Sequence, residues 1–207
     1  MIKQKPCFIT FEGGEAVGKS TLIHAVHTQL VSDEYDVLLT REPGGSAYGE
    51  KIRTLIFHPD YTPSCYTELL LVFAARRDHI ENVIAPSLAQ NKIVLCDRYI
   101  DSSYVYQGIL GGVDSGIIDT LCDQFVKPYF PDATFMIMAD TDISYARLIA
   151  RGIQNRNDNI DKNAINALSN AYHTQSQKRE NIYKIMNNGD ISDCVLDIMT
   201  KIRSLIY

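Results

Sequence analysis

The stretch GGEAVGKS, residues 13–20, constrains this chain more than any other part of its sequence. It follows an apolar run at 7–11 that is typical of a buried strand, and it opens a helical pattern at 19–32. The spacing G-x-x-x-x-G-K-[ST] between strand and helix predicts a loop whose main-chain N–H groups surround phosphate oxygens. The residues expected to hold these phosphates are Gly13, Gly14, Glu15, Ala16, Val17, Gly18, Lys19, Ser20 and Thr21.

Two side chains of this loop carry specific roles. Lys19 can reach the β- and γ-phosphates of a nucleotide, and the Ser20 hydroxyl can ligate Mg²⁺. The start of the following helix adds a partial positive charge. A glycine-rich turn with a chance Lys-Ser pair is the alternative. The sequence therefore predicts a site for a nucleotide triphosphate and Mg²⁺.

The rest of the chain alternates short apolar runs with helical patterns. Strands are expected at 7–11, 37–40, 93–96 and 134–138, with a weaker one at 183–187. Helices are expected at 19–32, 48–56, 66–90 with a kink at Pro86, 116–126, 141–150, 162–182 and 192–206. This alternation predicts one α/β domain over 1–207 with a parallel sheet, and ligands at the carboxyl ends of its strands.

Composition narrows the classes of protein. A net charge of −5 disfavours a broad basic face for nucleic acid. The five cysteines are odd in number and never spaced C-x-x-C, which argues against a disulfide framework or a zinc knuckle and for buried thiols in a reducing compartment. The longest apolar stretch, 69–75, is far below the about 20 residues that span a bilayer. With a strand pattern starting at residue 7 and no room for a signal peptide, we expect a cytoplasmic protein without membrane partners.

Three further segments occur in a fixed order after the loop: TREPGG at 40–45, FAARRD at 73–78 and DRYIDSSYVYQG at 97–108. Together with the loop they resemble the thymidylate kinase family, which phosphorylates dTMP with ATP. The resemblance implies a P-loop nucleoside monophosphate kinase fold with a five-stranded parallel sheet flanked by helices. It also implies a mobile lid at about 147–161 and a homodimer.

An acceptor of this kind carries close to two negative charges, so it needs neutralisation and alignment rather than a general base. Arginine pairs with phosphate oxygens through its planar fork. The resemblance places Arg41, Arg53 and Arg98 on the acceptor phosphate; a surface salt bridge is the alternative, most of all for Arg53. Asp97, at the end of the third strand, is expected on Mg²⁺, directly or through water, with capping of the next turn as the alternative.

For the base, Phe73 and Arg77 are one helical turn apart, which predicts that both face one pocket. The ring would stack on a pyrimidine and the guanidinium would donate to a carbonyl; core packing of Phe73 is the alternative. Arg76 is then expected to face solvent. The resemblance implies four further acceptor contacts: Ser103 and Gln107 at the base edge, Tyr106 beside the sugar and Glu15 at its 3′-hydroxyl.

Ala16 departs from the family pattern, in which an arginine often stands in this loop. A lid arginine must then stabilise the transferred phosphoryl group, with Arg156 first, Arg151 second and Arg147 structural. The catalytic set is therefore Lys19, Arg98, Arg156 and Arg151. The polar stretch 187–190, where the family has an apolar last strand, is another departure. A GTPase is disfavoured because no N-K-x-D motif occurs; another nucleotide or deoxynucleoside kinase and a non-catalytic nucleotide-binding regulator stay open.

Overall fold

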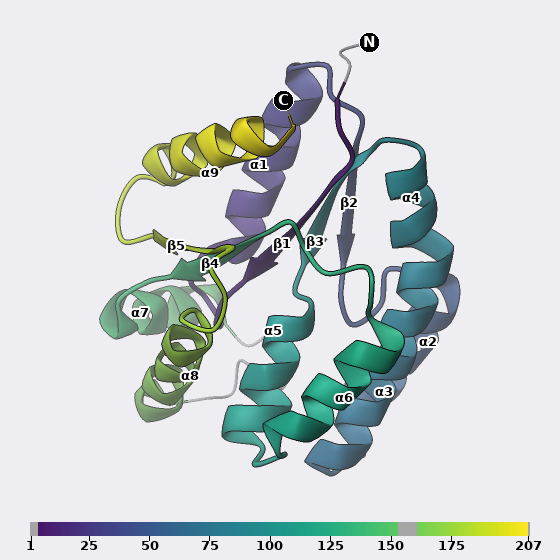
Figure 1. Cartoon of the computed structure of the whole chain (residues 1–207). Coiled ribbons are helices and arrows are strands. Elements are labelled where there is room, and N and C mark those ends of the chain that lie inside the picture. The colour runs from purple at the N-terminus through teal and green to yellow at the C-terminus, as the bar shows by residue number, and fades with distance from the viewer. Residues whose placement is uncertain (1–3, 153–160, 207) are drawn as a thin grey trace.

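The computed structural model describes residues 4–152 and 161–206. Its centre is a five-stranded parallel sheet in the order β2-β3-β1-β4-β5 (Figure 1). The strands are β1 Cys7–Glu12, β2 Val37–Arg41, β3 Ile93–Asp97, β4 Ala133–Met138 and β5 Ile182–Met186. The expected α/β fold with five parallel strands is confirmed.

Helices cover both faces of the sheet (Figure 1). They are α1 Lys19–Ser32, α2 Ala47–Ile56, α3 Cys65–His79, η1 Ile80–Ile84, α4 Ala85–Ala89, α5 Ile100–Ser103, η2 Tyr104–Leu110, α6 Ser115–Phe125, α7 Thr141–Arg151, α8 Lys162–Gln175 and α9 Ile191–Ile206. Both η segments are π-helical and continue the α-helix before them.

The two faces of β1 show how the core is divided. Ile9 and Phe11 pack with α1 and α9 on one face, whereas Phe8 packs with α3 and α6 on the other, because successive strand residues point in opposite directions. The chain leaves β1 into α1 on the first face and leaves the neighbouring β3 toward α5 and α6 on the second. A crevice for ligands is expected between strands whose connections diverge in this way.

Two expected helices differ from the structure, and one helical stretch was not expected. The long helix at 66–90 is α3, η1 and α4, with Pro86 in the first turn of α4 directly after the π-helical segment. The helix predicted at 162–182 is shorter in the structure: α8 ends at Gln175, whose side-chain amide donates to buried Asp101, and β5 begins at Ile182. The helical stretch Ile100 to Leu110 was not expected, and it carries much of the site.

Four of the five cysteines are buried, as expected, but Cys65 at the start of α3 is exposed. It lies against Gly111, directly after η2. In the described ranges, none of the helices is both long and apolar enough to span a membrane.

Candidate active site

The loop between β1 and α1 is shaped by its glycines. Gly13 and Gly18 have positive φ angles of 145° and 88°, and Ala16 also adopts a positive φ of 56°. A Cβ atom on Gly13 would collide with the carbonyl oxygen of Ile137 on β4, so only glycine fits there. The main chain can therefore lie close to an anion at the end of the sheet.

Asn187, which follows β5, holds the tip of this loop. Its Nδ2 donates to the carbonyl oxygen of Val17 at 2.8 Å, and its own carbonyl oxygen accepts from Arg147 Nη1 at 2.9 Å. Asn187 is buried. Asn187, part of the polar stretch that departs from the family pattern, thus holds the loop in place. The strand before it, β5, still pairs with β4.

A cavity of about 210 Å³ opens above the loop. Of the nine predicted phosphate-binding residues, all but Gly13 and Val17 line it; Val17 packs in the core. Three arginines complete the lining: Arg98, Arg147 and Arg151. We call this the P-loop pocket. Arg147, expected to be structural, therefore also faces the pocket.

Lys19 and Asp97 form an ion pair at the base of the site. Burial lowers the pKa of Lys19, and Arg98 acts in the same direction. Burial alone would raise the pKa of Asp97, but Lys19 and Arg98 outweigh it and hold that pKa below its ordinary value. Asp97 is therefore an ionised carboxylate at neutral pH.

Asp97 and the nearby Ser20 also offer oxygen ligands suited to Mg²⁺. Ser20 and Asp97 line one cavity, and within the described residues no group of three or more His, Cys, Asp or Glu side chains could hold a metal. Mg²⁺ is usually held by one or two carboxylates together with substrate phosphates and water. The donor set therefore fits an ion that arrives with a nucleotide.

The second cavity, of about 760 Å³, brings together Arg41, Arg53 and Arg98, and Arg151 also lines it. We call it the arginine cleft. Arg53 donates to the carbonyl oxygen of Pro43 at 2.8 Å, and burial together with nearby Arg41 lowers its pKa. Arg41 is exposed and pairs with Glu50. The three arginines predicted to bind the acceptor phosphate thus line one cavity, and cations this close to one another favour an anion.

Arg98 connects the arginine cleft to the P-loop. Its guanidinium donates to Glu15 Oε1 at 2.8 Å, to the Gly13 carbonyl oxygen at 2.9 Å and to the Tyr172 hydroxyl at 2.6 Å. The Tyr106 hydroxyl donates to the same Glu15 oxygen at 3.0 Å. Three residues predicted to contact the acceptor thus form one cluster. Tyr172 was missed: the helical period it shares with Leu168 predicts burial but not a place in the site.

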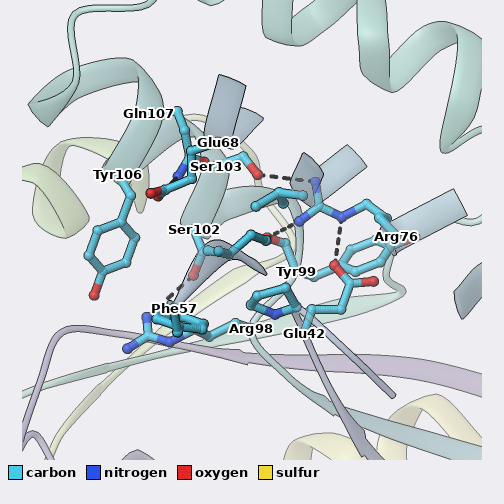
Figure 2. Close-up of a pocket in the computed structure, with 13 residues that line it drawn as sticks. Glu42, Phe57, Glu68, Arg76, Arg98, Tyr99, Ser102, Ser103, Tyr106 and Gln107 are labelled. Atoms are coloured by element: carbon cyan, nitrogen blue, oxygen red, sulfur yellow. Dashed lines mark hydrogen bonds and ion pairs between the residues drawn. The ribbon is translucent and has the colours of Figure 1, made fainter. Parts of the chain in front are cut away.

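The third cavity, of about 80 Å³, lies between α3, α5 and η2 (Figure 2). We call it the inner pocket. Arg76 is buried in its wall and donates to Glu42 Oε2 at 2.7 Å, to the Tyr99 carbonyl oxygen at 2.9 Å and to Ser103 Oγ at 3.1 Å. Gln107 also lines the pocket and donates to Glu68 Oε1 at 2.9 Å. Ser103, Tyr106 and Gln107 thus line one pocket, as predicted.

The predicted pair of Phe73 and Arg77 is displaced by one residue. Arg77 lies outside the pocket, where it pairs with Glu81. Phe73 packs in the core, with the Arg76 guanidinium 4.7 Å from its ring centre. The expectation that Arg76 faces solvent is therefore wrong: Val72 and Arg76 form the helical turn that lines the pocket. The buried charge is stable because Glu42, distant in sequence, supplies a counterion that no helical pattern reveals.

Phe57 and Val72 supply apolar walls that sequence reasoning missed. Among the lid candidates, Arg151 at the end of α7 lines both the P-loop pocket and the arginine cleft. Arg156 lies outside the described residues.

A P-loop beside a separate cleft of arginines, both reached by Arg98, defines a phosphotransferase whose acceptor is itself a phosphate, the class of the nucleoside monophosphate kinases. Residues 11–198 match the family described as "Thymidylate kinase". The chain belongs to the thymidylate kinase family, whose reaction is the ATP-dependent phosphorylation of dTMP to dTDP.

Individual relatives agree with this assignment. The thymidylate kinase of Ectopseudomonas mendocina is 38% identical over 202 residues, 96% of each chain. That of Chlamydia muridarum is 46% identical over 132 residues, which are 63% of this chain and 65% of the relative. The crystal structure of thymidylate kinase from Ehrlichia chaffeensis superposes with a TM-score of 0.74 at 33% identity, covering 96% of this chain and 99% of that one.

Proposed function

We propose that this chain transfers the γ-phosphoryl group of Mg·ATP to dTMP, giving dTDP and ADP for the synthesis of dTTP and DNA replication. The position of Arg98 carries the proposal, because this residue lines the P-loop pocket, the arginine cleft and the inner pocket. A guanidinium in that place can contact the group that passes between two nucleotides. Family membership supports the same reaction.

On the donor side, the P-loop main chain and Lys19 bind the β- and γ-phosphates. Ser20 and Asp97 would hold Mg²⁺, which neutralises charge on the donor phosphates when bound. Ala16 provides no cation, so Arg151 and Arg156 stabilise the charge of the transferred group. An arginine in such a role contributes about 10³-fold or more to the rate in related reactions.

On the acceptor side, Arg41, Arg53 and Arg98 bind and align the phosphate of dTMP, which needs no general base. Arg76, in place of Arg77, donates to the base. We assign the apolar contact to Phe57 and Val72 instead of Phe73, because both line the inner pocket. The remaining proposed contacts to the acceptor are Glu15, Ser103, Tyr106 and Gln107.

The test is ADP release with Mg·ATP against dTMP, dUMP, dCMP, dGMP and dAMP. We expect dTMP to give the highest kcat/KM. A rate with dTMP no higher than with dCMP, dGMP or dAMP would contradict the proposal, and so would a protein that binds ATP without turnover. In the same assay, Arg151→Ala and Arg156→Ala, made separately, test the lid arginines; if neither lowers kcat, their proposed role is wrong.

We further propose a homodimer in the cytoplasm. Exposed apolar side chains recur at helical spacing on three neighbouring helices: α2 contacts α3, and α3 contacts α6. They are Tyr48 and Leu55, Tyr66 and Leu70, and Ile117 and Phe125. Burying this surface in a second copy would remove it from water.

A further inference from the structure

We infer that Glu68 determines which pyrimidine the inner pocket accepts, by fixing the orientation of the Gln107 side-chain amide. The inference rests on the proposed function, since it concerns the base of the acceptor. Glu68 comes from α3 and Gln107 from η2, on the two walls of the pocket (Figure 2). Glu68 acts through Gln107 and is therefore a positioning residue.

The hydrogen bond between Glu68 and Gln107 determines which branch of the Gln107 amide is left for a ligand. Gln107 turns its amide nitrogen, Nε2, toward Glu68 and donates to Glu68 Oε1 at 2.9 Å. A side-chain amide carries its donor and its acceptor on opposite branches of one planar group. Committing the NH₂ group to Glu68 therefore makes the amide oxygen the branch that Gln107 offers to a ligand. Gln107 is only 5% exposed, so water does not compete freely for either branch.

Arg76 reaches the part of the pocket that holds Gln107 through a second residue, Ser103. Ser103 lies one helical turn before Gln107 and accepts from Arg76 at 3.1 Å, so the guanidinium reaches from α3 to the helical segment that carries the amide. Arg76 can only donate. Its plane is fixed by bonds to Glu42 and the Tyr99 carbonyl oxygen. The pocket therefore presents a fixed donor from α3 and a fixed acceptor from η2.

The Arg76 donor and the Gln107 acceptor complement the edge of some pyrimidines and not of others. Thymine and uracil offer a carbonyl oxygen, O4, beside the N3–H donor, which complements a donor beside an acceptor. Cytosine offers the reverse, an amino group beside an unprotonated N3. Bound in the same pose, cytosine would leave two buried polar groups unpaired on each partner, which is costly. Glu68 thus excludes dCMP without contacting it.

The test is the ratio of kcat/KM for dTMP to kcat/KM for dCMP in Glu68→Gln. A glutamine at 68 can both accept and donate, so the Gln107 amide is free to rotate and offer its NH₂ group to cytosine. We expect the ratio to fall by about tenfold or more, which corresponds to one mispaired hydrogen bond. The ratio for dTMP to dUMP should stay unchanged, because both bases present the same edge. General loosening of the pocket would disturb both ratios.

Two further variants complete the experiment. The exchange variant Glu68→Gln/Gln107→Glu puts a carboxylate acceptor at 107 and an amide partner at 68, and it should regain the preference for dTMP. Glu81→Gln removes an exposed carboxylate in η1, directly after α3, and should leave both ratios as in the unaltered chain.

Each outcome is decisive. An unchanged ratio in folded Glu68→Gln, or a loss that the exchange variant does not reverse, would overturn the inference. If Glu68→Gln does not fold, the exchange variant decides alone: a retained preference for dTMP supports the inference and a lost one overturns it. Absence of any preference for dTMP over dCMP in the unaltered chain would instead contradict the proposed function.

Discussion

At the scale of single residues, buried charge sets the character of this protein. Glu42 accepts from Arg76 and also contacts His79 Nδ1 at 3.0 Å, while His79 Nε2 lies 2.7 Å from Thr40 Oγ1. This chain of side chains ties the end of β2 to the last turn of α3. It keeps Arg76 ionised and oriented at a place from which water is excluded.

Arg76→Met should destabilise the fold by about 3–5 kcal/mol, because it leaves the Glu42 carboxylate buried without its counterion. Activity with dTMP should fall sharply in the same variant. Arg77→Met is the matched control: it breaks an exposed pair with Glu81 and an exposed, long hydrogen bond to the Phe125 carbonyl oxygen, and it should cost about 0–1 kcal/mol. Urea unfolding compares the two. Equal losses in both variants would contradict the placement of Arg76 in the pocket.

A second buried carboxylate makes stability depend on pH. Burial, with the charge of Asp101, raises the pKa of Glu12 from 4.5 to about 7, although hydrogen bonds from Ser102 and Tyr99 oppose the shift. The folded chain therefore keeps a proton that the unfolded chain releases between these two values. The stability contributed by this group is present at low pH and is lost as pH rises through that window.

Glu12→Gln removes the titrating group while keeping an oxygen for the Tyr99 N–H. Its free energy of unfolding relative to the unaltered chain should therefore rise by about 3 kcal/mol between pH 4.5 and 7 and then level off. Urea unfolding of both proteins at pH 5, 6, 7 and 8 measures the difference. Parallel pH dependence of the two proteins would show that Glu12 does not titrate there.

At the scale of elements, the P-loop depends on a segment far away in the sequence. The loop after β5 supplies Asn187, which reaches the Val17 carbonyl oxygen, whereas the adjacent Asn188 only accepts from the exposed N–H of Asp140. This hydrogen bond joins the segment after the last strand to the P-loop, so a change at Asn187 should affect nucleotide binding at the loop.

Asn187→Ala should lower stability by about 1–3 kcal/mol by leaving a buried carbonyl unpaired, and it should raise KM for ATP more than KM for dTMP. Asn188→Ala serves as its control, since it removes an exposed hydrogen bond. Steady-state kinetics with each substrate varied in turn separates the two effects. An equal rise in both KM values would argue for general unfolding rather than a disturbed loop.

Sequence reasoning predicted local features well and distant pairings poorly. The P-loop and all five strands were found because each depends on a short pattern, and the three arginines predicted for the acceptor do line one cavity. The α3 register failed because Arg76 and Arg77 are indistinguishable until Glu42 and Glu81 are placed in space. In the same way, the bond from Gln175, the last residue of α8, to Asp101 joins residues far apart in the sequence, and no local pattern predicts it.

At the scale of the whole molecule, the apolar surface of α2, α3 and α6 makes the oligomeric state testable. Leu70→Glu places a charge in the proposed interface and should convert the dimer to a monomer in sedimentation or light-scattering measurements. Leu196→Glu, equally exposed but on α9, should remain a dimer. A monomeric unaltered chain would refute the proposed homodimer directly.

Cys65 offers a practical route to watching this enzyme work. Its thiol is exposed while the other four are shielded, so a maleimide dye should attach at a single position without prior mutagenesis. That position lies where α3 meets the residue after η2, the two segments that line opposite sides of the inner pocket. Fluorescence from such a dye would report how the spacing of those walls responds as each nucleotide arrives.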